Sequence, residues 1–163
     1  MRKAQESTPS PGGRKDYPIH CVECGKKEVR PAVVKEEIKK SYDGRIYDLV
    51  IDDLPVRRCS ACGEVYYSVD SDERILAALR RQLRLLTPEH IRANLRSLSL
   101  QQNEAAARLG IAPETLSRWL SGGMVQSRAM DNLLRAFFAC PDLRHNLSAR
   151  GPRRRFGETV TSA

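Results

Sequence analysis

Four of the chain's five cysteines come in two pairs with the same spacing. Cys21-x-x-Cys24 and Cys59-x-x-Cys62 are each followed by a glycine. Two residues between cysteines let one tight turn point both sulfurs at a single ion, and two such turns supply the tetrahedral sulfur set that zinc prefers. The pattern therefore predicts one structural zinc ion per chain, held by Cys21, Cys24, Cys59 and Cys62, with no open coordination position for catalysis.

Other uses of these cysteines stay open. In an oxidising compartment the pairs would form disulfides, and four sulfurs can also hold iron for electron transfer. Residues 1–18 are polar and lack the apolar core of a signal peptide, and no apolar run is long enough to span a bilayer. We therefore expect a cytoplasmic protein with no membrane segment, in which thiols stay reduced and zinc is favoured.

A second group of residues has the spacing of a helix-turn-helix. The chain reads Gln102-x-x-x-Ala106-x-x-x-Gly110, and Leu116 and Trp119 follow. A small Ala106 lets a second helix cross closely over the first, Gly110 permits the sharp turn, and the two large apolar residues pack the second helix. The same spacing also occurs in helix pairs that only pack together.

The side chains left outward on the second helix are suited to DNA. Arg118 can fork onto the O6 and N7 atoms of guanine, and Glu114 can accept from the N4 atom of cytosine. Ser117 and Gln102 are donors suited to backbone phosphates, and we expect Arg128 to reach a phosphate too, with a solvated helix face as the alternative. Because one such helix binds weakly, we expect a homodimer, joined through its C-terminal half, on a palindromic operator of double-stranded DNA.

The charge distribution agrees with a polyanionic partner. Of the net charge of +8, residues 71–163 carry +7 and residues 1–70 carry +1. A composition with 40% hydrophobic and 29% charged residues excludes a wholly disordered chain. We find no grouping of side chains typical of catalysis, since the adjacent Asp52 and Asp53 would face opposite sides of a strand, and we expect no enzyme.

The elements that position these residues change character near Ser68. Alternating apolar residues over 29–34 and 46–51 flank the turn signal Asp43-Gly44 and predict a hairpin, with a last strand over 65–67. A helical period then begins, with Asp70 as the expected N-cap and Glu73 three residues on. Further helices are expected after Thr87, over 101–109 and 113–120, and from Ser127 to a stop at Pro141.

The predicted fold class is α+β, a small β-rich zinc domain with four cysteine ligands followed by an all-α helix-turn-helix bundle. The expected division is a disordered tail over 1–18, the zinc domain over 19–69, a linker helix over 70–86, the DNA-binding domain over 87–147 and a disordered basic tail over 148–163. The fifth cysteine, Cys140, is expected to be a buried, unreactive thiol.

From about His20 to Leu147 the chain resembles the MqsA-type antitoxins, also called YgiT-type zinc-finger regulators, and its helical half is similar to the Xre/Cro class. The most specific stretches include Leu98-Ser99-Leu100-x-Gln102-x-Glu104-Ala105 and Ser117-Arg118-Trp119-x-x-Gly122. The resemblance implies an autorepressor that binds its operator as a dimer, with base-reading positions at Glu114 and Arg118. Glu114 departs from the amide residue expected there. The alternative reading is a protein-interaction module whose zinc domain binds and neutralises a ribonuclease toxin.

Overall fold

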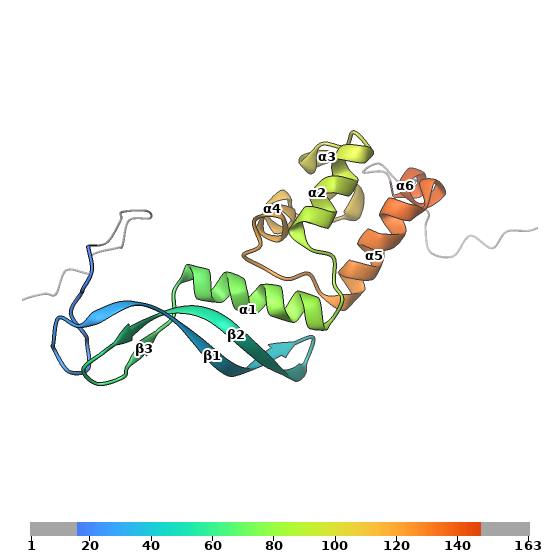
Figure 1. The fold of residues 1–163 in the computed structure, drawn as a ribbon. Helices are drawn as coiled ribbons and strands as arrows, with labels where there is room; N and C mark the ends of the chain where they lie inside the picture. Colours follow the sequence, from blue (N-terminus) through green and yellow to red (C-terminus); the bar gives the residue numbers. More distant parts are fainter. Residues whose placement is uncertain (1–15, 148–163) are drawn as a thin grey trace, which may run out of the picture.

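The computed structural model describes residues 16–147, so both predicted tails lie outside the described residues except for positions 16–18. The predicted α+β fold is confirmed. Three strands come first and helices follow (Figure 1). The strands are β1 (Val29–Tyr42), β2 (Arg45–Cys59) and β3 (Val65–Tyr66), and the helices are α1 (Val69–Gln82), α2 (Pro88–Ser97), α3 (Gln102–Leu109), α4 (Pro113–Ser121), α5 (Arg128–Ala139) and α6 (Pro141–Asn146).

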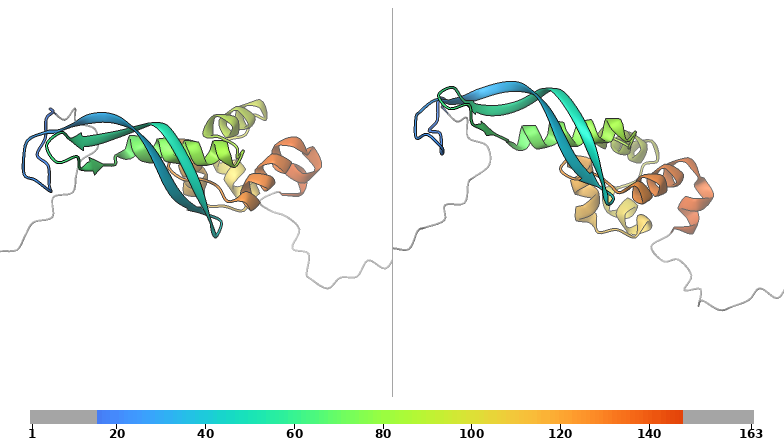
Figure 2. Two further views of the ribbon diagram at one scale, coloured as in Figure 1. Left: turned by 60° about the horizontal axis from the view of Figure 1, so that its bottom comes forward. Right: turned by 90° about the horizontal axis from the view of Figure 1, so that it is seen from below.

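Strands β1 and β2 form a long antiparallel hairpin. Their pairing runs from Val29 opposite Cys59 to Tyr42 opposite Arg45, and β3 pairs with the far edge of β2. The turn at Asp43 and Gly44 has φ angles of 46° and 74°, which confirms the predicted two-residue hairpin turn. A register shift near residues 34–36 marks a bulge, and a bulge increases the local twist of a hairpin. The strong twist is visible in Figure 2.

Helix α1 lies along one face of this hairpin (Figures 1 and 2). Its apolar side packs against β2, and together they form the sheet core, which consists of Leu49, Ile51, Leu54, Val56, Ile75, Ala78 and Leu79. The opposite face of the hairpin carries exposed and mostly polar side chains. The helix expected over 70–86 is therefore an integral layer on the sheet.

The start of α1 differs from the prediction. The N-cap is Ser68, whose backbone N–H donates to Ser71 Oγ at 2.8 Å, so the expected cap at Asp70 with Glu73 is wrong. The Ser71 hydroxyl is fully buried and donates to the carbonyl of Pro55 at 2.6 Å. A hydroxyl anchored to β2 fixes where the helix begins, and that tertiary contact outweighs the local capping pattern.

The other helices enclose a second apolar core, the bundle core. Leu116 and Trp119 are buried in it, as predicted, and Gly110 ends α3 in the left-handed conformation with φ of 69°. The predicted caps at Thr87 and Ser127 are confirmed, since their hydroxyls accept from the backbone N–H groups three residues on. The bundle core consists of Ile91, Leu95, Ala105, Ala106, Leu109, Leu116, Trp119, Leu134 and Phe137.

The region around Pro141 corrects two expectations. The long helix does end at Ala139, but Pro141 then opens a further short helix at its first position, where a missing N–H costs nothing. Cys140 joins the two helices in an extended conformation and is exposed, so the expectation of a buried thiol is wrong. Within residues 16–147, no helix is both long enough and apolar enough to cross a membrane.

Candidate metal centre and nucleic-acid interface

The two cysteine pairs fold into matching turns at the open end of the hairpin. In the first turn, the N–H of Cys21 donates to the carbonyl of Lys26 at 2.8 Å, and the N–H of Gly25 donates to the carbonyl of Cys21 at 2.9 Å. The second turn repeats both bonds between Cys59 and Glu64 and between Gly63 and Cys59. Gly25 and Gly63 have φ angles of 70° and 83°, a conformation that favours glycine and explains its place after each pair.

These turns bring all four sulfurs to one point. Every pair of Sγ atoms lies within 4.8 Å; Cys21 and Cys62 are 3.5 Å apart, and Cys24 and Cys59 are 3.7 Å apart. A tetrahedron with metal–sulfur bonds of about 2.3 Å has edges of about 3.8 Å, so the donor set fits one tetrahedral ion such as zinc. All four predicted ligands therefore meet, two of them buried and two more accessible.

A tyrosine that the sequence did not indicate supports this centre. The Tyr66 hydroxyl lies 3.2 Å from Cys21 Sγ and accepts the N–H of Val22 at 3.0 Å. Its hydrogen bond, with help from backbone N–H groups, lowers the pKa of Cys21 to about 6. A thiolate stabilised in this way is ready to bind a cation, and the contact fixes the orientation of the sulfur.

The opposite shift occurs at Cys62. The backbone near Glu64 favours its thiolate, but burial and three neighbouring thiols outweigh that bond and raise the pKa of Cys62 to about 12. Four crowded sulfurs cannot all ionise without a cation, because each new thiolate repels the others. A divalent ion that replaces the thiol protons would relieve this repulsion, so the four cysteines form a group that could hold a metal ion.

Helix α4 carries a row of exposed side chains along its outer face, called the outward row below. Glu114, Ser117 and Arg118 are exposed, whereas Leu116 and Trp119 on the opposite side are buried in the bundle core. The structure thus gathers three of the predicted DNA-contacting residues on one accessible helix face, with a rigid core behind it. This is the arrangement that a helix needs in order to enter a major groove.

Gln102 lies beside the same helix. It is the first residue of α3 and is half-buried, and its Nε2 atom donates to the carbonyl of Pro113 at 3.4 Å. The first turns of α3 and α4 therefore adjoin, and Gln102 comes to the end of α4 where Glu114 lies. No side chain of the described residues caps the start of α3, which leaves backbone N–H groups there for other acceptors.

Arg128 lies apart from this row. Its guanidinium donates to the carbonyl of Leu83 and lies 3.7 Å from the carboxylate of Asp131, while its backbone N–H donates to Asp43 at 2.7 Å. These contacts join α5 to the end of α1 and to the turn of the hairpin. The observed role of Arg128 is thus in the packing between segments distant in the sequence.

A buried polar group that sequence reasoning missed lies next to Arg128. Asp131 is fully buried and accepts from the N–H of Leu86 at 2.7 Å, from Gln126 at 3.0 Å and from Arg135 at 2.7 Å. Burial opposes ionisation, but these bonds outweigh it and hold the pKa of Asp131 below its ordinary value. An acidic residue in the first turn of a helix was the only sequence signal for it.

The chain matches a known protein family. No curated protein matches the chain. Residues 19–148 match a family model described as the antitoxin component of bacterial toxin-antitoxin system, MqsA. The match covers both the cysteine turns and helices α3 and α4, which are the two regions that carried the resemblance in the sequence.

Proposed function

The chain belongs to the MqsA family of antitoxins, and from this premise we propose that it is a sequence-specific DNA-binding regulator that represses its own operon. The observation that carries the proposal is the outward row of Glu114, Ser117 and Arg118 on α4, backed by the bundle core. Such a helix enters the major groove with its N-terminal half, where the side chains reach base edges.

Each residue of the row has a role that follows from its chemistry. Arg118 donates both arms of its guanidinium to one guanine, Glu114 accepts from a cytosine, and Ser117 donates to a backbone phosphate. Gln102, next to the start of α4, is placed for a neighbouring phosphate. The guanidinium of Arg128 already contacts Leu83 and Asp131. In this proposal Arg128 therefore reaches a phosphate only through the part of its side chain that stays exposed.

The metal in this proposal is one zinc ion per chain, and it is structural. Four thiolates saturate a tetrahedral ion and leave no position for a substrate, so the chain is not an enzyme in this account. The ion joins Cys21 and Cys24, which precede β1, to Cys59 and Cys62 at the end of β2 and in the turn after it. Thiols of this kind persist in the reducing cytoplasm, which is where we place the protein.

Binding takes place as a homodimer in the proposed mechanism. A single α4 offers few base contacts, whereas two copies joined through their C-terminal halves place two such helices on a palindrome, about one or two DNA turns apart. Sedimentation equilibrium at micromolar concentration tests this arrangement. A mass of twice 18.4 kDa is expected, and a monomer that stays monomeric on the operator would overturn it.

The DNA-binding proposal is tested with the promoter region upstream of the gene. Fluorescence anisotropy should show salt-dependent binding, and Arg118→Ala should weaken it by about 1–3 kcal/mol. Arg74→Ala is the matched control, because Arg74 is an exposed arginine on α1 that pairs with Asp53 on β2 and lies outside the row on α4. Equal affinity of Arg118→Ala and Arg74→Ala for the operator would refute base reading by Arg118.

A second function, neutralisation of a ribonuclease toxin by the zinc half, is favoured by the outer face of the hairpin. Val33, Ile46 and Val50 are 68%, 72% and 54% exposed there, although α1 covers the other face. Strand β1 is also the outer strand of the sheet, and such an edge can pair with a strand of a partner. Apolar side chains beside an open edge suit a protein partner.

Co-expression with the product of the adjacent gene tests this second function. The two proteins should co-purify, and Val33→Lys with Val50→Lys should abolish the complex while operator binding persists. Ala93→Lys with Ser97→Lys, at two exposed positions of α2, is the control for two added charges away from the hairpin. A complex that survives the substitutions at Val33 and Val50 would place the toxin elsewhere.

A further inference from the structure

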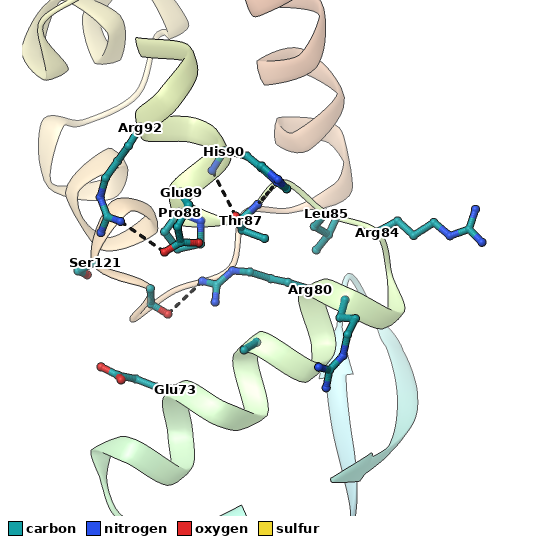
Figure 3. Close-up of a pocket in the computed structure, with 13 residues that line it drawn as sticks. Glu73, Arg80, Arg84, Leu85, Thr87, Pro88, Glu89, His90, Arg92 and Ser121 are labelled. Carbon is teal, nitrogen blue, oxygen red and sulfur yellow. Dashed lines mark hydrogen bonds and ion pairs between the residues drawn. The ribbon is translucent and has the colours of Figure 1, made fainter. Parts of the chain in front are cut away.

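Arg80 links the sheet to the end of helix α4, the proposed recognition helix. It lies in α1 directly after Leu79, which belongs to the sheet core, and only 4% of its surface is exposed. Its Nη2 atom donates to the carbonyls of Gly122 at 3.0 Å and Met124 at 2.7 Å, just past the last residue of α4. Figure 3 shows the guanidinium reaching from α1 across to the segment after Ser121.

The chemistry of this contact is that of a C-terminal cap. The last carbonyls of a helix have no partner within the helix, and the helix dipole favours a cation beside them. Arg80 supplies that cation, and Arg92 of α2 adds a second bond from its guanidinium to the carbonyl of Leu120. Within residues 16–147, no carboxylate lies within ion-pairing distance of Arg80. Its Nη2 atom is satisfied by the two carbonyls, Glu89 attracts its charge at longer range, and its buried Nε has no partner among the described residues.

The contact lies beside a hollow in the surface. A cavity of about 540 Å³ separates α1 from the start of α2 beside Arg80. Its walls include the charged side chains of Glu73, Glu89 and Arg92 (Figure 3). The bonds of Arg80 to the carbonyls of Gly122 and Met124 connect α1 to the segment after α4 at the edge of this hollow.

The turn of the hairpin makes a second connection to the same segment. The Tyr42 hydroxyl donates to the carbonyl of Gln126 at 3.0 Å, and Asp43 accepts the N–H of Arg128 at 2.7 Å. Gln126 is itself buried, and its side chain donates to the carbonyl of Leu86 and to Asp131. The segment from Gly122 to Arg128, which follows the recognition helix, is therefore held by α1 at one end and by the hairpin turn at the other.

The two apolar cores also meet in this segment. Met124 packs against the bundle core, whereas Val125 packs against the sheet core. Successive residues thus belong to different cores, and the segment cannot shift without disturbing both. We propose that Arg80 is a positioning residue for DNA recognition: together with Tyr42 and Asp43 it fixes the recognition helix α4 relative to the sheet, so that the two halves act as one rigid body.

The effect of Arg80 on DNA binding rests on the proposed function. The connection that Arg80 makes between α1 and the end of α4 does not. A rigid joint means that the sheet, with any partner bound to it, has a fixed position relative to the operator. It also means that α4 enters the groove with its C-terminal end held, so that its base-reading side chains are preorganised. Loss of Arg80 should loosen the joint and weaken operator binding without any change at the DNA contacts themselves.

Nitrogen-15 relaxation of the full, zinc-loaded chain tests the joint without DNA. The wild-type sheet and bundle should share one rotational correlation time. The triple variant Arg80→Ala, Tyr42→Phe, Asp43→Gly removes these polar contacts, and glycine suits the positive φ at position 43. It should give two different times, with the amide shifts of both cores retained. Independent tumbling of the halves in the wild type, or an unchanged single time in the variant, would overturn the proposal.

Operator affinity gives the second measurement. Arg80→Ala should bind about tenfold more weakly, Arg80→Lys should recover part of that loss because an ammonium can still donate to the two carbonyls, and the exposed neighbour Arg81→Ala should bind like wild type. Equal affinities of Arg80→Ala and Arg81→Ala would contradict a positioning role. If the wild type binds no operator, the proposed function fails, while the relaxation measurement still decides whether the joint is rigid.

Discussion

The cysteine-rich end and the helical end of this molecule are stabilised by different interactions. At the metal centre, the buried cluster consists of Val29 with the ligands Cys21 and Cys59, and only Ile19, Cys24 and Tyr66 pack around it. The bundle has a continuous apolar core, and its helices carry side-chain caps at Thr87 and Ser127. Because so little apolar area is buried around the cysteine turns, the proposed zinc ion would supply stabilising free energy there, whereas the bundle has an apolar core of its own.

Metal removal should have the largest effect on stability, and this effect should be confined to the cysteine-rich end. A small effect would contradict the difference described between the two ends. Structural zinc contributes about 10–16 kcal/mol of binding free energy at such sites. After chelation, or in Cys59→Ser, hydrogen exchange should become fast in both cysteine turns and β3, while α2 to α5 stay protected. Retained protection of the turns without metal would mean that the bonds of the turns alone suffice.

A substitution that leaves a cavity in the bundle core should destabilise the bundle and leave zinc binding unchanged. Phe137 is fully buried, and Phe137→Ala should cost about 3–5 kcal/mol of unfolding free energy. Its neighbour Phe138 is only partly buried, so Phe138→Ala is the matched control with a smaller loss. The Phe137→Ala variant should still bind one zinc ion per chain at full affinity. Loss of zinc together with the bundle would show that the two ends fold as one unit.

A smaller effect should come from the buried carboxylate between the two cores. Asp131→Asn removes the charge that Arg135 and the N–H of Leu86 stabilise, and should cost about 2–3 kcal/mol at neutral pH. Because the pKa of Asp131 is lower in the folded state than in the unfolded state, its contribution is present above the ordinary carboxyl pKa and is lost as pH falls through the folded value.

Denaturant unfolding at several pH values checks this prediction. The difference in unfolding free energy between wild type and Asp131→Asn should be largest near neutrality and should shrink below about pH 4. Glu104→Gln is the control, because Glu104 forms an exposed pair with Arg108 and should contribute little at any pH. A difference that is independent of pH would show that the charge of Asp131 is not what the neighbouring donors stabilise.

Local patterns in the sequence were enough to predict the turns, helix caps and buried helix faces that depend on neighbouring residues. The hairpin turn at Asp43 and Gly44 and the caps at Thr87 and Ser127 were predicted and confirmed, because each is set by residue types within a few positions. The meeting of the four sulfurs is a long-range contact, and it was predicted because the two pairs share one spacing that suits a single ion. The buried side of α4 followed from helical period alone.

The contacts that the sequence did not reveal join segments far apart in the chain. The start of α1 is set by the bond of Ser71 to Pro55, and the Tyr66 bond to Cys21 joins residues 45 positions apart. No local pattern singled out Arg80, and Arg128 was expected to reach a phosphate. Arg80 is buried, and both arginines donate to carbonyls outside their own helices. Polar tethers of this kind have no period and no local motif, so only the fold shows them.

Methylation interference at guanine N7 tests most directly whether α4 reads bases with Arg118. With the wild-type protein, methylation of one guanine in each operator half-site should block binding, because the guanidinium donates to that N7 atom. With Arg118→Ala, methylation of the same guanine should no longer matter, although other positions keep their effect. If the interference pattern is identical for both proteins, Arg118 does not read that base and α4 does not lie in the groove as described.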